Sequence, residues 1–202
     1  MKMEIVSQID AQKAVADKVL KALFPIDPYA IVAGGAPRDW YMGNAAKDVD
    51  VFFNVGRRPY WVIKKQLEEV GISNFIEKTG ENIPENYKAN PHLRCVFDIV
   101  IDGIQVQIMA MECSTFQVVE MFPFSICQVW YKNGNIGVDP TFRYTVETKS
   151  ILMTQNELYG AENKYTERLK TKFPEPEWKW MLPAAWHEAK ALWIMQNKGR
   201  TI

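Results

Sequence analysis

The segment that decides the fold is VAGGAPRDWYMGNAAKDVDVF, which spans residues 32–52. The apolar residues 29–33 predict a short buried strand that leads directly into Gly34 and Gly35 and then into a helix start. Paired glycines let a backbone approach an anion closely, and free N–H groups at a helix start can hold phosphate oxygens. Arg38 follows in the first helical turn, where its guanidinium can add a bidentate phosphate contact. The segment therefore predicts a phosphate-binding turn.

Two aspartates complete the segment. Asp48 and Asp50 begin a second predicted strand, residues 48–54, and residues two apart on a strand project from the same face of the sheet. Their carboxylates repel each other unless a cation lies between them, and Mg²⁺ prefers such oxygen ligands together with substrate phosphates. An isolated Asp-x-Asp pair is usually surface acid, and an isolated Gly-Gly pair is usually a turn. Together at this spacing they predict a metal–triphosphate site for in-line displacement at phosphorus.

The order and spacing of these residues resemble the head-domain signature of the tRNA nucleotidyltransferases, also called CCA-adding enzymes, and of the bacterial poly(A) polymerases. Both groups belong to the polymerase-β-like nucleotidyltransferase superfamily. The resemblance lies mainly in this one segment and continues more faintly downstream. The matching elements are Gly34-Gly35-x-x-Arg38-Asp39, then Gly43, then Asp48-x-Asp50.

The resemblance implies a role for each matching residue. Asp48 and Asp50 would hold two Mg²⁺ ions, and Gly34 and Gly35 would face the β- and γ-phosphates of an incoming nucleoside triphosphate. Arg38 and Asp39 would brace the loop and the triphosphate. The nucleotide-binding set implied in this way is Gly34, Gly35, Arg38, Asp39 and Lys47.

The third metal ligand departs from the family pattern. The superfamily usually places a third carboxylate on the next hairpin, and residues 95–101 and 104–110, joined by an Asp-Gly pair, predict that hairpin. At the matching place this chain carries Gln107, which can coordinate through its carbonyl oxygen but supplies no negative charge. Asp98 and Glu112 are alternatives, although ordinary surface acid is the more common role for such residues.

A fainter similarity follows in residues 124–131, Gly134 and residues 136–140. This stretch resembles the family sequence Arg-Arg-Asp-Phe-Thr-Ile-Asn-Ala, which also leads to a glycine and an Asp-Pro pair. Where the family has Arg-Arg-Asp, this chain has Met121-Phe122-Pro123, and Cys127 stands in place of the asparagine. In the family those polar residues contact the sugar and base region of the nucleotide. We therefore expect a different mode of nucleotide selection.

Composition excludes several classes of protein. The 202 residues include 24 basic and 24 acidic side chains, so the formal net charge is zero, which argues against coating of nucleic acid by bulk charge. The apolar runs are too short to span a membrane, and the first residues lack the apolar core of a signal peptide. The 3 cysteines are widely spaced and form no CxxC pair, which favours a reduced, cytoplasmic protein with buried thiols.

The pattern predicts an α+β fold of the polymerase-β-like nucleotidyltransferase type, with a mixed sheet flanked by helices and a short helical C-terminal portion. We expect a head domain over residues 1–150 and a helical extension over 151–202 that packs on it. The tryptophans of that extension favour packing over stacking on single-stranded nucleic acid. The predicted helices are 8–24, 36–42, 60–70, 114–121, 157–173 and 183–197, with a loop over 79–94.

The function predicted is Mg²⁺-dependent transfer of a nucleoside monophosphate from a nucleoside triphosphate to a hydroxyl, with release of pyrophosphate. The acceptor stays open between an RNA 3′ end such as that of tRNA, a protein and a small molecule. The alternative is a catalytically silent nucleotide-binding or nucleic-acid or protein-interaction module on the same fold. The short C-terminal portion argues against full CCA addition, and small stand-alone proteins of this type suggest a phage origin as one expectation.

Overall fold

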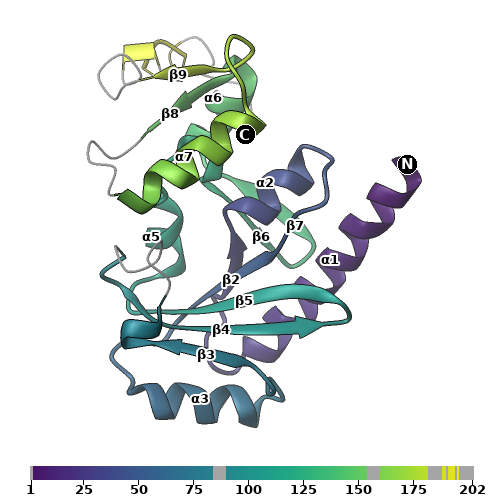
Figure 1. The fold of residues 1–202 in the computed structure, drawn as a ribbon, viewed down its shortest axis with the longest axis vertical. Coiled ribbons are helices and arrows are strands. Elements are labelled where there is room, and N and C mark those ends of the chain that lie inside the picture. The colour runs from purple at the N-terminus through teal and green to yellow at the C-terminus, as the bar shows by residue number, and fades with distance from the viewer. Residues whose placement is uncertain are drawn as a thin grey trace. The chain divides into compact units, whose positions relative to one another are not determined.

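The computed structural model describes residues 2–83, 90–153, 160–181, 188–189, 191–193 and 195 (Figure 1). The chain divides into two compact units. The first consists of Met1–Glu120 and Val129–Gly137, and the second consists of Met121–Gln128 and Val138–Ile202. The domain boundary expected at residue 150 is a different division of the chain and stays a prediction.

The first unit is built on a 7-stranded mixed sheet in the order β3-β4-β5-β2-β1-β6-β7 (Figure 1). β2 and β5 run parallel, whereas β1 pairs antiparallel with both β2 and β6. The strands predicted near 29–33, 48–54, 95–101 and 104–110 all lie in this sheet, as expected. The strand bounds are β1 Ile31–Ala33, β2 Val49–Asn54, β3 Ile76–Thr79, β4 Leu93–Ile101, β5 Ile104–Met111, β6 Val129–Lys132 and β7 Asn135–Val138.

The three longest helices of the first unit bury one face of this sheet. The helix bounds are α1 Lys2–Leu23, α2 Gly35–Tyr41, α3 Tyr60–Glu69, η1 Gly80–Asn82 and α5 Thr115–Glu120. Val19 of α1 and Ile63 of α3 share one apolar core with Val49, Val51 and Phe53 of β2. Because side chains alternate along a strand, the remaining positions of β2, including Asp50, face the opposite side of the sheet. The apolar period of β2 thus fixes where the predicted metal ligand points.

The second unit contains η2 (Ser125–Cys127), α6 (Pro140–Thr148), β8 (Ser150–Leu152), α7 (Gly160–Lys172) and β9 (Lys179–Met181). The Asp139 side chain caps α6 by accepting a hydrogen bond from Thr141 N at 2.7 Å, and Pro140 occupies the first helical turn. β8 and β9 form a parallel two-stranded sheet, which the sequence did not predict.

Several predicted elements differ in detail from those observed. α1 begins at Lys2, well before residue 8. At the start of the predicted loop 79–94, β3 ends at Thr79 and η1 follows over Gly80–Asn82. Residues 84–89 of that loop lie outside the described residues. Within residues 124–131, the strand begins only at Val129. Of the predicted helix 157–173, α7 supplies 160–172. Most of the predicted helix 183–197 lies outside the described residues.

Tryptophans of the second unit pack against aromatic rings of the same unit, and packing of the extension on the head domain stays a prediction. Trp180 meets Phe124 with ring centroids 5.9 Å apart, and Trp193 meets Tyr144 at 5.7 Å. Cys95, Cys113 and Cys127 are all buried and free, which confirms the prediction of buried thiols. In the part of the chain that the structure describes, no helix is both long and apolar enough to cross a membrane.

Candidate active site

The turn between β1 and α2 is set by Gly34. Its φ of 80° lies in the left-handed region that favours glycine. The Gly34 N–H donates to Val129 O at 3.0 Å and so extends the pairing of β1 with β6. This N–H is therefore occupied by the sheet. The N–H groups of Gly35 and Ala36, in the first turn of α2, have no intrahelical acceptor and are the ones positioned to meet an anion.

Arg38 and Asp39 form an ion pair inside the first unit. Arg38 Nε lies 2.8 Å from Asp39 Oδ1, and the two side chains are only 8% and 7% exposed. A guanidinium held in this way is a fixed positive charge rather than a mobile surface arm. Its field reaches the predicted metal site, because Arg38 lowers the pKa of Asp50 against the other influences on that carboxyl.

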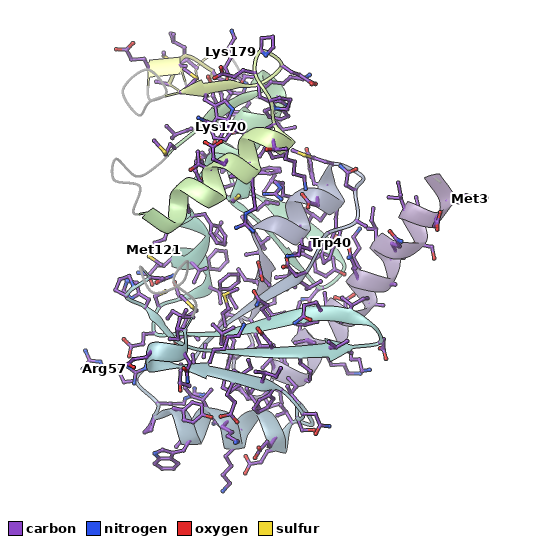
Figure 2. The ribbon with its side chains drawn as sticks, viewed as in Figure 1. Met3, Trp40, Arg57, Met121, Lys170 and Lys179 are labelled. Atoms are coloured by element: carbon purple, nitrogen blue, oxygen red, sulfur yellow. The ribbon has the colours of Figure 1, made fainter. Side chains whose placement is uncertain are left out.

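The loop that delivers Asp48 is tied to α1 by Gln12, a residue that the sequence analysis did not single out. Gln12 Nε2 donates to Ala46 O at 2.7 Å, and Gln12 Oε1 accepts from Ala46 N at 2.9 Å. The same Oε1 accepts from Trp40 Nε1 at 2.8 Å. Figure 2 shows Trp40 at α2, beside α1. Gln12 lies one helical turn before the buried Val15 and Ala16 of α1, and no local sequence pattern predicts which groups its amide binds.

Asp50 is the member of the aspartate pair whose charged form is destabilised by its surroundings. Its Oδ1 is buried and has no hydrogen-bond partner among the described residues. Burial, and then the charge of Asp48, raise the pKa of Asp50 from its ordinary 3.8 to about 7. Asp48 itself lies one residue before β2 and is partly exposed, and Lys47 beside it is exposed. A buried carboxylate oxygen without a donor is costly, and a cation would satisfy it.

Gln107 lies directly beside Asp50. The parallel register of β2 and β5 pairs these two residues, and the antiparallel register of β4 and β5 pairs Gln107 with Asp98. Gln107 Nε2 donates to Asp98 Oδ1 at 2.9 Å, and Lys78 of β3 forms an ion pair with Asp98. The Asp98 side chain is 14% exposed, and its negative charge is balanced by Lys78.

Glu112 lies apart from this group. It follows β5 five residues beyond Gln107, or about 16 Å along an extended strand, and it pairs with Arg94 at 3.0 Å. In the described ranges, no cluster of three or more His, Cys, Asp and Glu side chains is arranged to hold a metal ion. Among the described residues, the structure therefore brings Asp48, Asp50, Gln107 and Arg38 together, and the third carboxylate that acts on Asp50, that of Asp98, is already engaged by Lys78 and Gln107.

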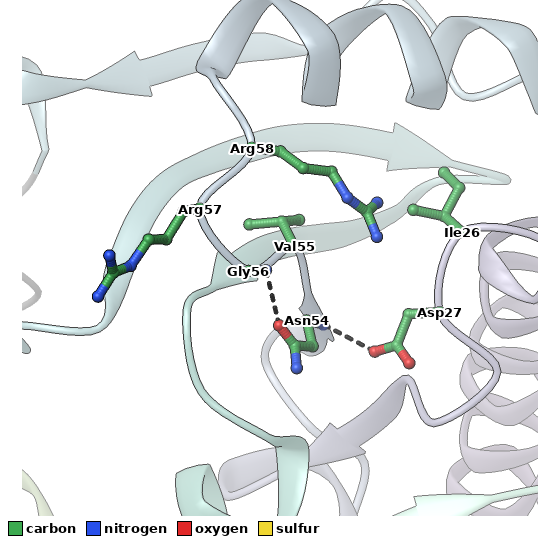
Figure 3. Close-up of a pocket in the computed structure, with 7 residues that line it drawn as sticks. All are labelled: Ile26, Asp27, Asn54, Val55, Gly56, Arg57 and Arg58. Atoms are coloured by element: carbon green, nitrogen blue, oxygen red, sulfur yellow. Dashed lines mark hydrogen bonds between the residues drawn. The ribbon is translucent and has the colours of Figure 1, made fainter.

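A hollow of about 600 Å³ lies at the opposite end of β2 (Figure 3). Its carboxylate, Asp27, already accepts from Asn54 N at 2.7 Å and from Tyr29 N at 2.9 Å. Figure 3 shows the Arg57 and Arg58 side chains pointing away from each other. Asn54 follows Asp50 by four residues, about 13 Å along the strand. The hollow is therefore separate from the aspartate pair, and its arginines do not converge on one anion.

Residues 121–128 belong to the second unit, so Met121, Phe122, Pro123 and Cys127 lie in a different unit from the aspartate pair. Cys127 is fully buried. Where the family has polar side chains for the nucleotide, this chain therefore offers an inaccessible thiol at one of the positions.

No protein-family model and no curated protein matches this sequence. Solved structures of nucleotidyltransferases do match its fold. An apo CCA-adding enzyme superimposes with a TM-score of 0.56 at 9% identity and covers 91% of this chain and 44% of that chain. The Thermotoga maritima CCA-adding enzyme complexed with tRNA gives 0.54 at 11% identity, covering 90% and 43%. A tRNA-processing enzyme in an apo form gives 0.50 at 12%, covering 71% and 36%.

These comparisons bear on the fold. The α+β architecture with its mixed sheet is the nucleotidyltransferase fold of the CCA-adding enzymes, as the sequence predicted. At 9–12% identity the likeness shows the fold alone. This chain also spans less than half the length of each of these structures.

Proposed function

We propose that this protein is a Mg²⁺-dependent nucleotidyltransferase that moves a nucleoside monophosphate from a nucleoside triphosphate to a hydroxyl and releases pyrophosphate. The observation that carries the proposal is the buried, unpartnered Oδ1 of Asp50, next to Asp48 on a nucleotidyltransferase fold. Two neighbouring carboxylates, one of them desolvated and lacking a donor, form a stable arrangement once a divalent cation neutralises them.

The residues present fit such a metal site. Asp48 and Asp50 would supply the carboxylate ligands for two Mg²⁺ ions, with the neutral side chain of Gln107 at the third position. When bound, Mg²⁺ would neutralise the carboxylates and stabilise negative charge on the triphosphate. Asp98 is the weaker choice of ligand because Lys78 and Gln107 already engage its carboxylate.

The phosphates would meet the N-terminal turn of α2. The N–H groups of Gly35 and Ala36 would donate hydrogen bonds to phosphate oxygens, while Gly34 shapes the turn through its positive φ. Arg38, held by Asp39, would add a fixed positive charge beside the metal site. Lys47, exposed next to Asp48, would contribute a mobile one.

An RNA 3′ end is the first acceptor to test, since the Thermotoga maritima CCA-adding enzyme is seen with tRNA. The purified protein would be incubated with each α-labelled nucleoside triphosphate, Mg²⁺ and either total RNA or total protein. Labelled RNA, lost on removal of Mg²⁺, is the expected product. A labelled protein would keep the transferase function but change the acceptor class.

The paired variants for this assay are Asp48→Asn combined with Asp50→Asn, and Asp102→Asn as a matched control. Asp102 lies in the exposed β4–β5 turn with φ 51°, a conformation that asparagine also adopts readily. The double variant should lose both transfer and Mg²⁺-dependent triphosphate binding, and the control should keep both. Equal triphosphate affinity in the double variant would remove the metal role of these residues.

A silent nucleotide-binding module is the second candidate function, and Gln107 is the observation that favours it. A site with two carboxylates and an amide carries one negative charge fewer than a site with three carboxylates. Tight triphosphate binding by the wild type without label transfer to any acceptor would support the silent module over the enzyme.

A further inference from the structure

Trp130 projects from the same face of the first unit's sheet as Asp50. The register pairs Val32 of β1 with Val51 of β2, and both side chains point into the core under α1 and α3. The next residues along each strand, Ala33 and Asp50, therefore point the other way. Trp130 of β6 pairs directly with Ala33 and shares its face.

The two side chains lie in one row across three neighbouring strands. With strands about 4.8 Å apart, the backbones of Asp50 and Trp130 are roughly 10 Å from each other. Ala33, which stands between them, contributes only a methyl group. Because the Trp130 ring lies over Gly137 of β7, a nucleotide that joins the two sites would extend from Asp50 past β1 and β6.

The Trp130 indole is held in place by two neighbours. A Cβ atom added to Gly137 would lie 2.3 Å from Cε2 and 2.4 Å from Nε1 of the ring, so only glycine leaves room for it. Phe116 of α5 packs against the ring edge-on, with centroids 6.0 Å apart and an interplanar angle of 77°. The ring is therefore already oriented in the free protein, so binding of a ligand would cost little side-chain entropy.

Comparison with Trp40 separates a core tryptophan from an available one. Trp40 is 4% exposed, and its indole N–H donates a hydrogen bond to Gln12. Trp130 stays partly exposed, and the described residues supply no acceptor for its Nε1–H. An oriented, accessible ring beside a phosphate site suits a base, whose π-face stacks on aromatic side chains.

We propose that Trp130 is the platform on which the base of the bound nucleoside triphosphate stacks. The inference rests on the proposed function, because it assumes that the triphosphate sits at Asp50 and the α2 turn. Stacking tolerates every base, so the four nucleoside triphosphates should bind with affinities within a few-fold of one another.

The test compares ligands that share phosphates but differ in having a base. Titration calorimetry with Mg²⁺ would measure ATP, CTP and inorganic tripolyphosphate binding to the wild type, Trp130→Ala and Trp130→Phe. We expect Trp130→Ala to bind both nucleotides about tenfold more weakly, and tripolyphosphate with unchanged affinity. Trp130→Phe should keep most of the nucleotide affinity. Trp61→Ala, which removes an exposed ring of α3, is the control and should change nothing.

Each other outcome counts against the inference in a recognisable way. Unchanged nucleotide affinity in Trp130→Ala, or an equal loss for tripolyphosphate, would show that Trp130 only supports the fold. Either result would overturn the stacking role and leave the proposed function standing. If the wild type bound neither nucleotide nor tripolyphosphate, the proposed function would fall together with the inference.

Discussion

Gln107 and Asp50 are register partners across the parallel strands β5 and β2. An amide therefore stands immediately beside Asp50, at the place where the resemblance implies that the family carries a third carboxylate. The amide is itself engaged with Asp98, whose charge Lys78 balances. With Gln107 at this position, the ligand-free protein has no further uncompensated negative charge beside Asp50. The same amide attracts Mg²⁺ less strongly than a carboxylate would.

Gln107→Asp should increase Mg²⁺ affinity or transfer rate, because it adds a negative charge next to Asp50. A change of about tenfold or more is expected for gain of a metal ligand. Mg²⁺ titration and the labelled-nucleotide assay would measure it. Gln105→Asp, two residues earlier on the same face of β5, is the matched control. An equal effect of both changes would mean that Gln107 is not at the third position.

Asp98→Asn should lower the free energy of unfolding by about 1–3 kcal/mol, since it leaves Lys78 without its partner at a mostly buried site. Glu112→Gln should cost less than about 1 kcal/mol, because its pair with Arg94 is more exposed. Denaturant unfolding of both variants would measure this. If Asp98→Asn instead kept full stability and abolished Mg²⁺ binding, Asp98 would be the third ligand.

Asp50 should make the ligand-free protein less stable as pH rises. Its folded-state pKa of about 7 lies above its ordinary 3.8, so between these values the folded protein binds this proton more tightly than the unfolded chain does. The stability it contributes is complete below about pH 4 and is lost as pH rises through about 7.

Asp50→Asn should therefore be more stable than the wild type at pH 8, by up to a few kcal/mol at about 1.4 kcal/mol per pKa unit. The advantage should shrink as pH falls toward 4. Denaturant unfolding without divalent cations, at several pH values, measures the difference between the two proteins. An advantage that is independent of pH would contradict the raised pKa.

Gln12→Leu should destabilise the protein by about 1–3 kcal/mol, because it leaves the N–H of Ala46 and the indole N–H of Trp40 without their acceptor. Loosening the loop before Asp48 should also weaken Mg²⁺-dependent triphosphate binding. Gln8→Leu, on an exposed turn of α1, serves as the control. Loss of stability with unchanged triphosphate binding would restrict Gln12 to a purely structural role.

The sequence by itself determined the centre of the fold and the face of the sheet on which Asp50 lies. The alternation of Val49, Val51 and Phe53 with Asp50 is local, and a period of two permits only one face for the carboxylate. The Asp-Gly pair likewise specified the β4–β5 hairpin, because such a turn depends on two adjacent residues. The expected mixed sheet and α+β class followed from these local signals and the resemblance.

Tertiary structure alone decided the contacts between residues far apart in the chain. Gln12 reaches Ala46 across 34 positions, and no local pattern marks either residue. The segment before Val129 has β-rich composition, yet Ser125 Oγ accepts a hydrogen bond from the distant Leu152 N, and a 3₁₀ turn forms there instead of a strand. Local periodicity records which face of an element is apolar, whereas burial of a polar group and the identity of its partner depend on the whole folded chain. The unpartnered oxygen of Asp50 and the balanced charge of Asp98 are therefore properties of the tertiary structure.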